Sequence, residues 1–327
     1  YCLLSRGLGD VYKRQLQKKR LTGQLKSLEI LSKQSREKKN RTMNSQSTNH
    51  VLLIRPAEFY CNEQTIETNH YQNNDKLLSR EETLSLATHE FNQFEKTLID
   101  NNIEVTTLNG NIGCPDNIFP NWAVTYSDKT MDIFSMLGKN RRLEKSQDHI
   151  DFLKEMYTLS EDYSPYEDQN LFLEGTSSLV MDRINKIAYM GVSARSNLEL
   201  AEIWSKKKDY TLIPFETNSH TGGSIYHSDV MMYIGTELAV VCEDSIKNGK
   251  SQVIENLERT HELMTISQSQ LLDFCGNCIE VKDDQNRLCL IMSSKAFSGY
   301  DNSQRAILDQ FLSLIHISEP TRQEAIS

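Results

Sequence analysis

Short apolar runs and amphipathic segments alternate along most of this chain, and this alternation constrains the fold more than any other feature of the sequence. His50–Arg55 is an apolar run that Pro56 ends, as expected of a buried strand. Ser79 and Glu82 have the spacing of a helix capping box, and an apolar stripe at helical spacing follows them. A second strand is then predicted at 103–108. This pattern is typical of an α/β fold.

The order strand, strand, helix, strand recurs over the rest of the chain. Strands are predicted at 118–126, 131–137, 170–173, 179–182, 186–192, 210–215, 224–235, 237–242, 279–281 and 288–292, and helices at 143–156, 198–206, 251–264 and 304–312. Neither glycine-rich phosphate-loop pattern is present, which disfavours a nucleotide-binding doubly wound fold. No linker rich in Pro, Ser or Gly interrupts the pattern, so one domain is predicted over residues 43–312.

The composition is that of an ordinary globular protein. The chain has 327 residues, of which 38% are hydrophobic and 25% are charged. No apolar run approaches the ~20 residues of a membrane-spanning helix, so no membrane association is expected. The 7 Cys are an odd number in a long chain and do not indicate a disulfide framework. A reducing compartment, the cytoplasm, is therefore expected.

The two ends of the chain differ in character from its body. Residues 1–42 carry 12 Lys or Arg against 3 Asp or Glu, which leaves 24 basic and 42 acidic groups for the rest. So acidic a body repels phosphate, and no nucleic acid is expected as a partner. Residues 10–15 and 312–317 can be encoded by DNA strings that are reverse complements of each other. We therefore expect a non-native, irregular leader at 1–42 and an adapter-derived tail at 313–327.

Three short segments carry candidate catalytic or binding residues. Glu174 stands at a predicted strand end beside a tight turn. It is either a general acid/base or a solvated turn residue. His227 and Asp229 lie two residues apart in an apolar run, which predicts that they share one face of a strand. Such a pair is costly to bury unless it lines a cleft, and the alternative is a core His bonded to a backbone carbonyl. Asp116 and Asn121 either bind a ligand or form Asx-type turns.

Cys275 and Cys278 form a lone Cys-x-x-Cys pattern ahead of a predicted hairpin strand. A thioredoxin-like motif would stand at a helix N-terminus, and a zinc site would need two further ligands at suitable spacing, which the sequence does not offer. A redox protein that uses these two thiols remains an alternative, and no metal is predicted.

Taken together, several segments resemble the arginine deiminase-related, amidinotransferase-like family of the pentein superfamily, most closely its citrulline-hydrolysing branch. They occur in the family's order and cover nearly all of residues 43–312. They are Arg55-Pro56, 69–72 (NHYQ), 115–122 (PDNIFPNW), 140–144 (NRRLE), 173–183 (LEGTSSLVMDR), 226–232 (YHSDVMM) and Gly276-Asn277. The resemblance implies a five-bladed α/β propeller of ββαβ units, here with a truncated last unit, and an active site at one mouth of its axis.

The resemblance also implies the chemistry. A Cys thiolate attacks the planar carbon of a guanidino or ureido group, and His227 protonates the leaving amine and later activates water. Glu174 orders His227, and Asp229 accepts N–H bonds from the substrate head group. No metal or organic cofactor is implied, the partner is a small amino acid, and a homo-oligomer stays open. A hydrolase is expected, with an amidinotransferase-like enzyme as the variant.

Asn121 stands where many relatives have a second carboxylate. A guanidinium offers only donors, whereas a ureido group also offers a carbonyl acceptor, which suits the amide of Asn. We therefore expect hydrolysis of citrulline to ornithine, with arginine or methylated arginine as the alternative substrate. Asp116 and Arg141 are further candidates for substrate binding, Arg141 through the substrate α-carboxylate.

The family's nucleophile lies in a glycine-rich segment near the C-terminus, and this sequence has no such segment. Cys242 and Cys278 do not match that motif and are expected to be buried apolar residues. This predicts that the polypeptide as given cannot form the covalent intermediate, although its gene encodes an enzyme. A non-catalytic binding protein with the same fold is the alternative from another class.

Overall fold

The computed structural model describes residues 46–71 and 78–317. The predicted leader, and the part of the predicted tail beyond residue 317, lie outside these ranges. None of the helices in the described ranges combines the length and the hydrophobicity that a bilayer crossing requires.

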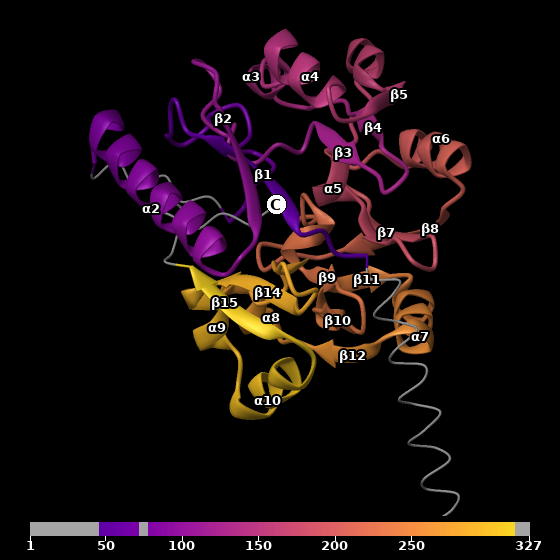
Figure 1. Cartoon of the computed structure of the whole chain (residues 1–327). Coiled ribbons are helices and arrows are strands. Elements are labelled where there is room, and N and C mark those ends of the chain that lie inside the picture. Colours follow the sequence, from indigo (N-terminus) through magenta and orange to yellow (C-terminus); the bar gives the residue numbers. More distant parts are fainter. Residues whose placement is uncertain (1–45, 72–77, 318–327) are drawn as a thin grey trace, which may run out of the picture. The chain divides into compact units, whose positions relative to one another are not determined.

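The described strands form five separate small sheets (Figure 1). The first sheet pairs β1 (His50–Arg55) with β2 (Glu104–Asn109) in parallel, and α2 (Arg80–Asp100) connects the two strands. α2 begins as the sequence predicts, because the Ser79 side chain accepts the Glu82 backbone N–H while the Glu82 carboxylate accepts the Ser79 N–H.

The other four sheets share one connectivity, in which two antiparallel strands are followed by a helical segment and by a strand parallel to the second. The second sheet has β3 (Ala123–Thr125), β4 (Thr130–Ile133), α3 (Lys139–Arg142), α4 (Gln147–Lys154) and β5 (Thr158–Asp162). The third has β6 (Val180–Asp182), β7 (Ile187–Gly191), α6 (Leu198–Lys208) and β8 (Thr211–Thr217), with β11 (Ile246–Asn248) at its edge.

The fourth sheet has β9 (Met232–Ile234), β10 (Leu238–Val241), α7 (Lys250–Thr260) and β12 (Glu262–Thr265). The fifth has β13 (Ile279–Lys282), β14 (Leu288–Ser293), α9 (Ser294–Gly299), α10 (Asn302–Phe311) and β15 (Ser313–Ile317). Short helical turns connect these units: η1 (Ser164–Gln169), α5 (Gly175–Ser178), η2 (Ser228–Val230), η3 (Glu243–Ser245) and α8 (Gln268–Leu272). The recurring order agrees with the predicted rhythm of the sequence. The prediction of a truncated last unit is wrong, because residues 313–317 supply the third strand of the fifth sheet.

The first and fifth sheets share one apolar cluster. Leu98 at the end of α2 and Ile103 before β2 are buried together with Ile291 of β14 and Ile315 of β15. α2 accordingly lies beside β15 (Figure 1). β15 begins where the sequence places the tail, since residues 313–317 pair in parallel with β14. A segment with apolar residues on both faces can complete a sheet in this way even if its coding DNA is adapter-derived.

Three strand predictions are wrong. Residues 170–173 form no strand and contain only an isolated bridge from Leu173 to Ser196. The other two errors fall beside the candidate site. Residues 224–235 do not form one strand, because η2 turns the chain at Ser228–Val230 and only Met232–Ile234 is extended in β9. The Ser228 hydroxyl donates to Ser178 O and accepts the Gly191 N–H, at 2.7 and 2.8 Å. These bonds hold the turn, so His227 and Asp229 do not lie on one face of a strand.

The predicted strand at 118–126 is also mostly wrong. Turns occupy the chain up to Trp122, and only Ala123–Thr125 forms a strand, β3. The turn places Asp116 and Asn121 in buried positions, 5% and 2% exposed. Polar residues at these positions interrupt the apolar pattern. The backbone forms a turn here because their side chains form hydrogen bonds that a strand would not allow.

Candidate active site

A buried carboxylate–imidazole pair lies at the centre of the candidate site. Glu174 immediately precedes α5 and His227 immediately precedes η2. His227 Nε2 lies 2.7 Å from Glu174 Oε2, and the side chains are 3% and 0% exposed. The other Glu174 oxygen accepts the Leu137 backbone N–H at 3.0 Å. Glu174 is therefore not a solvated turn residue, and His227 is bonded to a carboxylate rather than to a backbone carbonyl.

Two arginines set the charge of this pair. Arg141 Nη1 and Arg195 Nη1 lie 3.6 and 3.7 Å from Glu174 Oε2. Burial raises the pKa of Glu174, but Arg195, the His227 hydrogen bond and Arg141 outweigh it and hold the pKa well below its ordinary value. Burial lowers the pKa of His227 to about 4, although Glu174 opposes this. At neutral pH Glu174 is therefore ionised and His227 is neutral.

These charge states determine the tautomer of His227. An ionised carboxylate can only accept hydrogen bonds, so the Nε2 that faces Glu174 carries the imidazole hydrogen. Nδ1 is then unprotonated and can take up a proton. A neutral imidazole held by a carboxylate in this tautomer is the arrangement that general acid/base catalysis requires.

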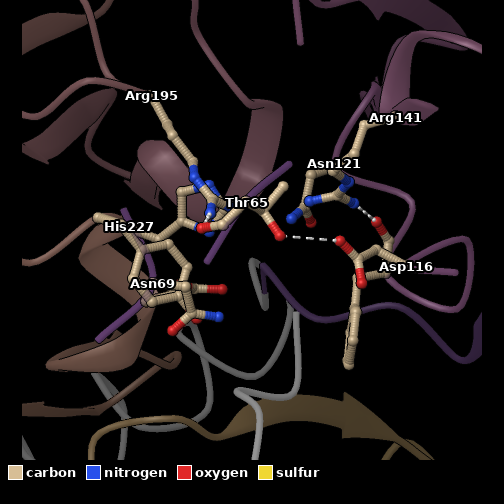
Figure 2. A pocket seen from close by; sticks show the side chains of 10 residues that line it. Thr65, Asn69, Asp116, Asn121, Arg141, Arg195 and His227 are labelled. Carbon is tan, nitrogen blue, oxygen red and sulfur yellow. Dashed lines mark hydrogen bonds between the residues drawn. The ribbon is translucent and has the colours of Figure 1, made fainter. Parts of the chain in front are cut away.

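The imidazole of His227 lines a pocket whose walls come from five stretches of the chain. Figure 2 shows the side chains that surround it. They are Thr65, Asn69, Asp116, Phe119, Asn121, Arg141, Arg195, Tyr226, His227 and Asp229. Five of the six predicted site residues, all except Glu174, are in this set, and Glu174 lies directly behind His227.

Asp229 is partly buried in the pocket wall, and its side-chain Oδ1 is buried and unengaged. Its Oδ1 has no hydrogen-bond partner among the residues that the structure describes. Burial raises the pKa of Asp229 to about 8, and hydrogen bonds from Ser177 and from backbone N–H groups offset only part of that rise. The carboxyl group is therefore mostly neutral at pH 7 and has an acceptor left for a ligand N–H.

Asn121 and Asp116 are held by hydrogen bonds from neighbouring side chains. The Ser177 hydroxyl donates to Asn121 Oδ1 at 2.8 Å. Asp116 Oδ2 accepts from Asn62 Nδ2 at 2.5 Å and from the Thr65 hydroxyl at 3.4 Å. Both residues thus contact side chains remote in sequence, in addition to any role in local turns.

Arg141 is more constrained than the sequence predicts. Its guanidinium is 3% exposed and contacts both carboxylate oxygens of Glu144, at 3.0 and 3.2 Å. It also donates to the Phe119 carbonyl. With these partners and Glu174 nearby, most of its donors are engaged within the protein. Binding of a substrate carboxylate by Arg141 stays a prediction.

Arg195 is a pocket residue that the sequence analysis missed. It donates to the Thr68 hydroxyl at 2.9 and 2.7 Å and to the Thr65 carbonyl at 2.9 Å, and its guanidinium carbon lies 4.7 Å from the Tyr226 ring centroid. No motif marks Arg195, because its importance comes from burial at 2% exposure beside Glu174. Thr65 was also missed, whereas Asn69 and Tyr226 fall in segments that carry the family resemblance.

The cysteines within the described ranges do not line this pocket, and all six are free thiols. Cys242 is buried as predicted, whereas Cys278 is only partly buried. Burial raises the pKa of both thiols, which disfavours the reactive thiolate. The described residues also contain no group of three or more His, Cys, Asp or Glu that could hold a metal ion.

The chain belongs to the pentein superfamily of arginine-modifying hydrolases, as the sequence predicts. Residues 55–323 match the family model of eukaryotic N,N dimethylarginine dimethylhydrolases, and the chain belongs to that family. No curated protein matches the chain.

Solved structures of several penteins have the same fold. The substrate-bound N-terminal domain of ArgZ, an arginine dihydrolase from the ornithine-ammonia cycle in cyanobacteria, has a TM-score of 0.64 at 16% identity, over 82% of this chain and 91% of that one. Unliganded AgrE has a TM-score of 0.63 at 15% identity, and the match covers 82% of this chain but only 36% of the AgrE chain. An adduct of dimethylarginine dimethylaminohydrolase has a TM-score of 0.56 at 15% identity, and the match covers 83% of this chain and 92% of that one. These identities show a shared fold only.

Proposed function

We propose that this protein binds a ureido or guanidino amino acid in the pocket beside His227 and is built to hydrolyse the C–N bond of its head group, with citrulline as substrate and ornithine as product. One observation carries the proposal. The Glu174–His227 pair and the unengaged oxygen of Asp229 belong to one buried site. A binding surface alone does not require a neutral imidazole fixed by a carboxylate.

The five sheets are, in this proposal, the blades of a five-bladed propeller. Four of them have the ββαβ order, and the cluster around Leu98 joins the first to the fifth. Residues next to strands of three different sheets meet at the site. Leu137 follows β4, Glu174 precedes β6 and His227 precedes β9. A pocket formed by the ends of several sheets supports a location at one mouth of the propeller axis.

Most polar residues of the pocket have a role in the proposed reaction. His227 Nδ1 exchanges protons with the leaving amine and then with water, and the ionised Glu174 stabilises the imidazolium that forms. Asp229 accepts an N–H of the head group. Asn121 and Asp116 hold the planar group from the other side, and Arg195 with Arg141 makes the pocket attractive to the ligand α-carboxylate.

Citrulline suits the pocket better than arginine or methylated arginine on two grounds. The ureido group is neutral, and the neighbouring Asp229 carboxyl is mostly neutral at pH 7 because its pKa is raised to about 8. Asn121 supplies an amide that can donate to the ureido oxygen, which a guanidinium lacks. Family membership and the related structures keep dimethylarginine and arginine as the alternative substrates.

The covalent step distinguishes two hypotheses, an enzyme and a non-catalytic binding protein. Family chemistry uses a thiolate, and none of the cysteines in the described ranges lines the pocket. That observation favours binding without turnover for the chain as given. We propose that this polypeptide binds substrate but forms no thioester-type intermediate.

Binding and turnover assays test the proposal together. Isothermal titration calorimetry should show 1:1 binding of L-citrulline that His227→Ala weakens, while no ornithine forms. Mass spectrometry after treatment with 2-chloroacetamidine should show no pocket-directed label on Cys242 or Cys278. Absence of binding for citrulline, arginine and dimethylarginine alike would overturn the proposed function, and ornithine formation with labelling of either thiol would overturn the claim that this chain lacks a nucleophile.

A further inference from the structure

We propose that Ser177 is a positioning residue that fixes which side of the Asn121 amide the ligand meets, and that it thereby selects a ureido over a guanidino head group. The inference rests on the proposed function, since it concerns the same pocket. Ser177 does not line the pocket and belongs to none of the catalytic roles assigned above.

The hydrogen bond between the two side chains gives the amide a direction. Ser177 and Asn121 are 0% and 2% exposed, and the Ser177 hydroxyl donates to Asn121 Oδ1 at 2.8 Å. With the carbonyl oxygen turned to Ser177, the amide NH2 is left for the pocket that Asn121 lines. An NH2 group can donate to a ureido oxygen, but it repels the N–H groups of a guanidinium.

The backbone prevents the two residues from drifting apart. A Cβ added at Gly175 would lie 2.3 Å from the Asn121 carbonyl oxygen, so α5 packs directly on the turn that carries Asn121. The other end of α5 is held as well, because the Ser228 hydroxyl donates to the Ser178 carbonyl at 2.7 Å. The hydroxyl and the amide therefore stay within reach of each other.

Asp229 makes the preference depend on the charge of the ligand. The Ser177 hydroxyl also bonds to the Asp229 carboxyl group, yet it has a single hydrogen to donate. A neutral Asp229 leaves that hydrogen to Asn121. A guanidinium would ionise Asp229, and the carboxylate would compete for the hydrogen and release the amide. A neutral ureido ligand thus keeps the hydrogen-bond chain intact, whereas a cationic ligand disrupts it.

Among the charged groups around Asp229, the carboxylate of Glu174 acts in the same direction as burial and raises the pKa. Glu174 precedes α5, and neutral His227 on the same segment as Asp229 adds no charge. Arg141 and Arg195 lie 3.6 and 3.7 Å from Glu174, and Asp116 lines the same pocket. Asp229 therefore loses its proton when a ligand cation arrives and keeps it when the ligand is neutral.

The test compares dissociation constants of L-citrulline and L-arginine by isothermal titration calorimetry at pH 7. Ser177→Ala should shift the citrulline-to-arginine affinity ratio toward arginine by about tenfold, the size expected when one hydrogen bond no longer orients a ligand-binding amide. Thr176→Ala is the matched control, since it removes a neighbouring hydroxyl that forms no hydrogen bond with Asn121 or Asp229, and it should leave the ratio unchanged. Ser177→Cys keeps a donor at this position but a weaker one, and a smaller shift in the same direction is expected.

A double substitution makes the test specific. In an Asn121→Asp background the side chain has no amide to orient, so adding Ser177→Ala should change the ratio by less than about twofold. An unchanged ratio in Ser177→Ala, or the same shift in both backgrounds, would overturn this inference while leaving the proposed function in place. Failure of the unmodified protein to bind either ligand would overturn both.

Discussion

At the scale of single residues, burial moves the pKa values of neighbouring groups apart. Burial lowers the pKa of His227 to about 4 and raises that of Asp229 to about 8, while two arginines keep Glu174 ionised. One site therefore holds a neutral base, a neutral acid and an anion at the same pH. Such separation assigns different roles to groups that would titrate close to their ordinary values in water.

The pH dependence of ligand binding follows from Asp229. Its folded pKa lies above its unfolded value of about 3.9, so the folded protein holds this proton until the pH passes about 8. Citrulline affinity should be constant from pH 6.5 to 7.5 and should fall above pH 8, as measured by calorimetry. Asp229→Asn cannot ionise and should show no fall in this range, and an equal fall in that variant would contradict the assignment.

At the scale of elements, the short helix α5 brings the site together. Glu174 stands at its start, Ser177 lies within it, and its backbone packs on Asn121. Gly175 makes this possible, because its φ of +44° and its close approach to the Asn121 carbonyl leave no room for a side chain. The motif Glu-Gly in the sequence is thus a packing requirement as well as a family feature.

Gly175→Ala should destabilise the protein and weaken ligand binding. The added methyl group meets the Asn121 carbonyl at 2.3 Å, so the backbone must move, at a cost of roughly 2–4 kcal/mol in the free energy of unfolding. Gly222→Ala is the control, since it has a positive φ of +85° but nothing within 4 Å of the new Cβ. It should cost only about 1 kcal/mol in a urea titration. Equal losses in the two variants would show that close packing on Asn121 does not matter.

At the scale of the whole molecule, the first and last sheets depend on one another. Leu98 is fully buried where α2 meets Ile291 and Ile315 of the fifth sheet. Contacts of this kind between distant parts of the sequence couple the stability of the units that they join. The loops that carry the site come from several sheets, so the geometry of the pocket depends on all of them.

Leu98→Ala should therefore lower the stability of the whole molecule. The truncation should cost about 2–5 kcal/mol in urea unfolding. Leu86→Ala on the same helix, at a position that is 44% exposed, should cost less than about 1 kcal/mol. Fluorescence of Trp122 and Trp204, buried near the second and third sheets, should shift to the same lower midpoint as circular dichroism. Separate midpoints would show that the sheets unfold independently.

Much of the fold could be read from local patterns. The capping box at Ser79, most helices and the repeated order of strands depend on periodicity and short-range hydrogen bonds, which neighbouring residues determine. The strand predicted at 224–235 was wrong because hydroxyl-to-backbone bonds from Ser228 override the apolar pattern. Such bonds join residues that are far apart in sequence, and no local window contains both partners.

The sequence by itself determined the alternation of strands and helices, the family, and three residues whose chemistry suits a planar nitrogen-rich group: Glu174, His227 and Asp229. Only the tertiary structure decided that Glu174 and His227 are in contact, that Arg195 approaches them, and that Ser177 holds the amide of Asn121. The physical reason is that propensity and periodicity act between neighbours, whereas burial, charge pairing and pKa depend on groups that the folded chain brings together from different sheets.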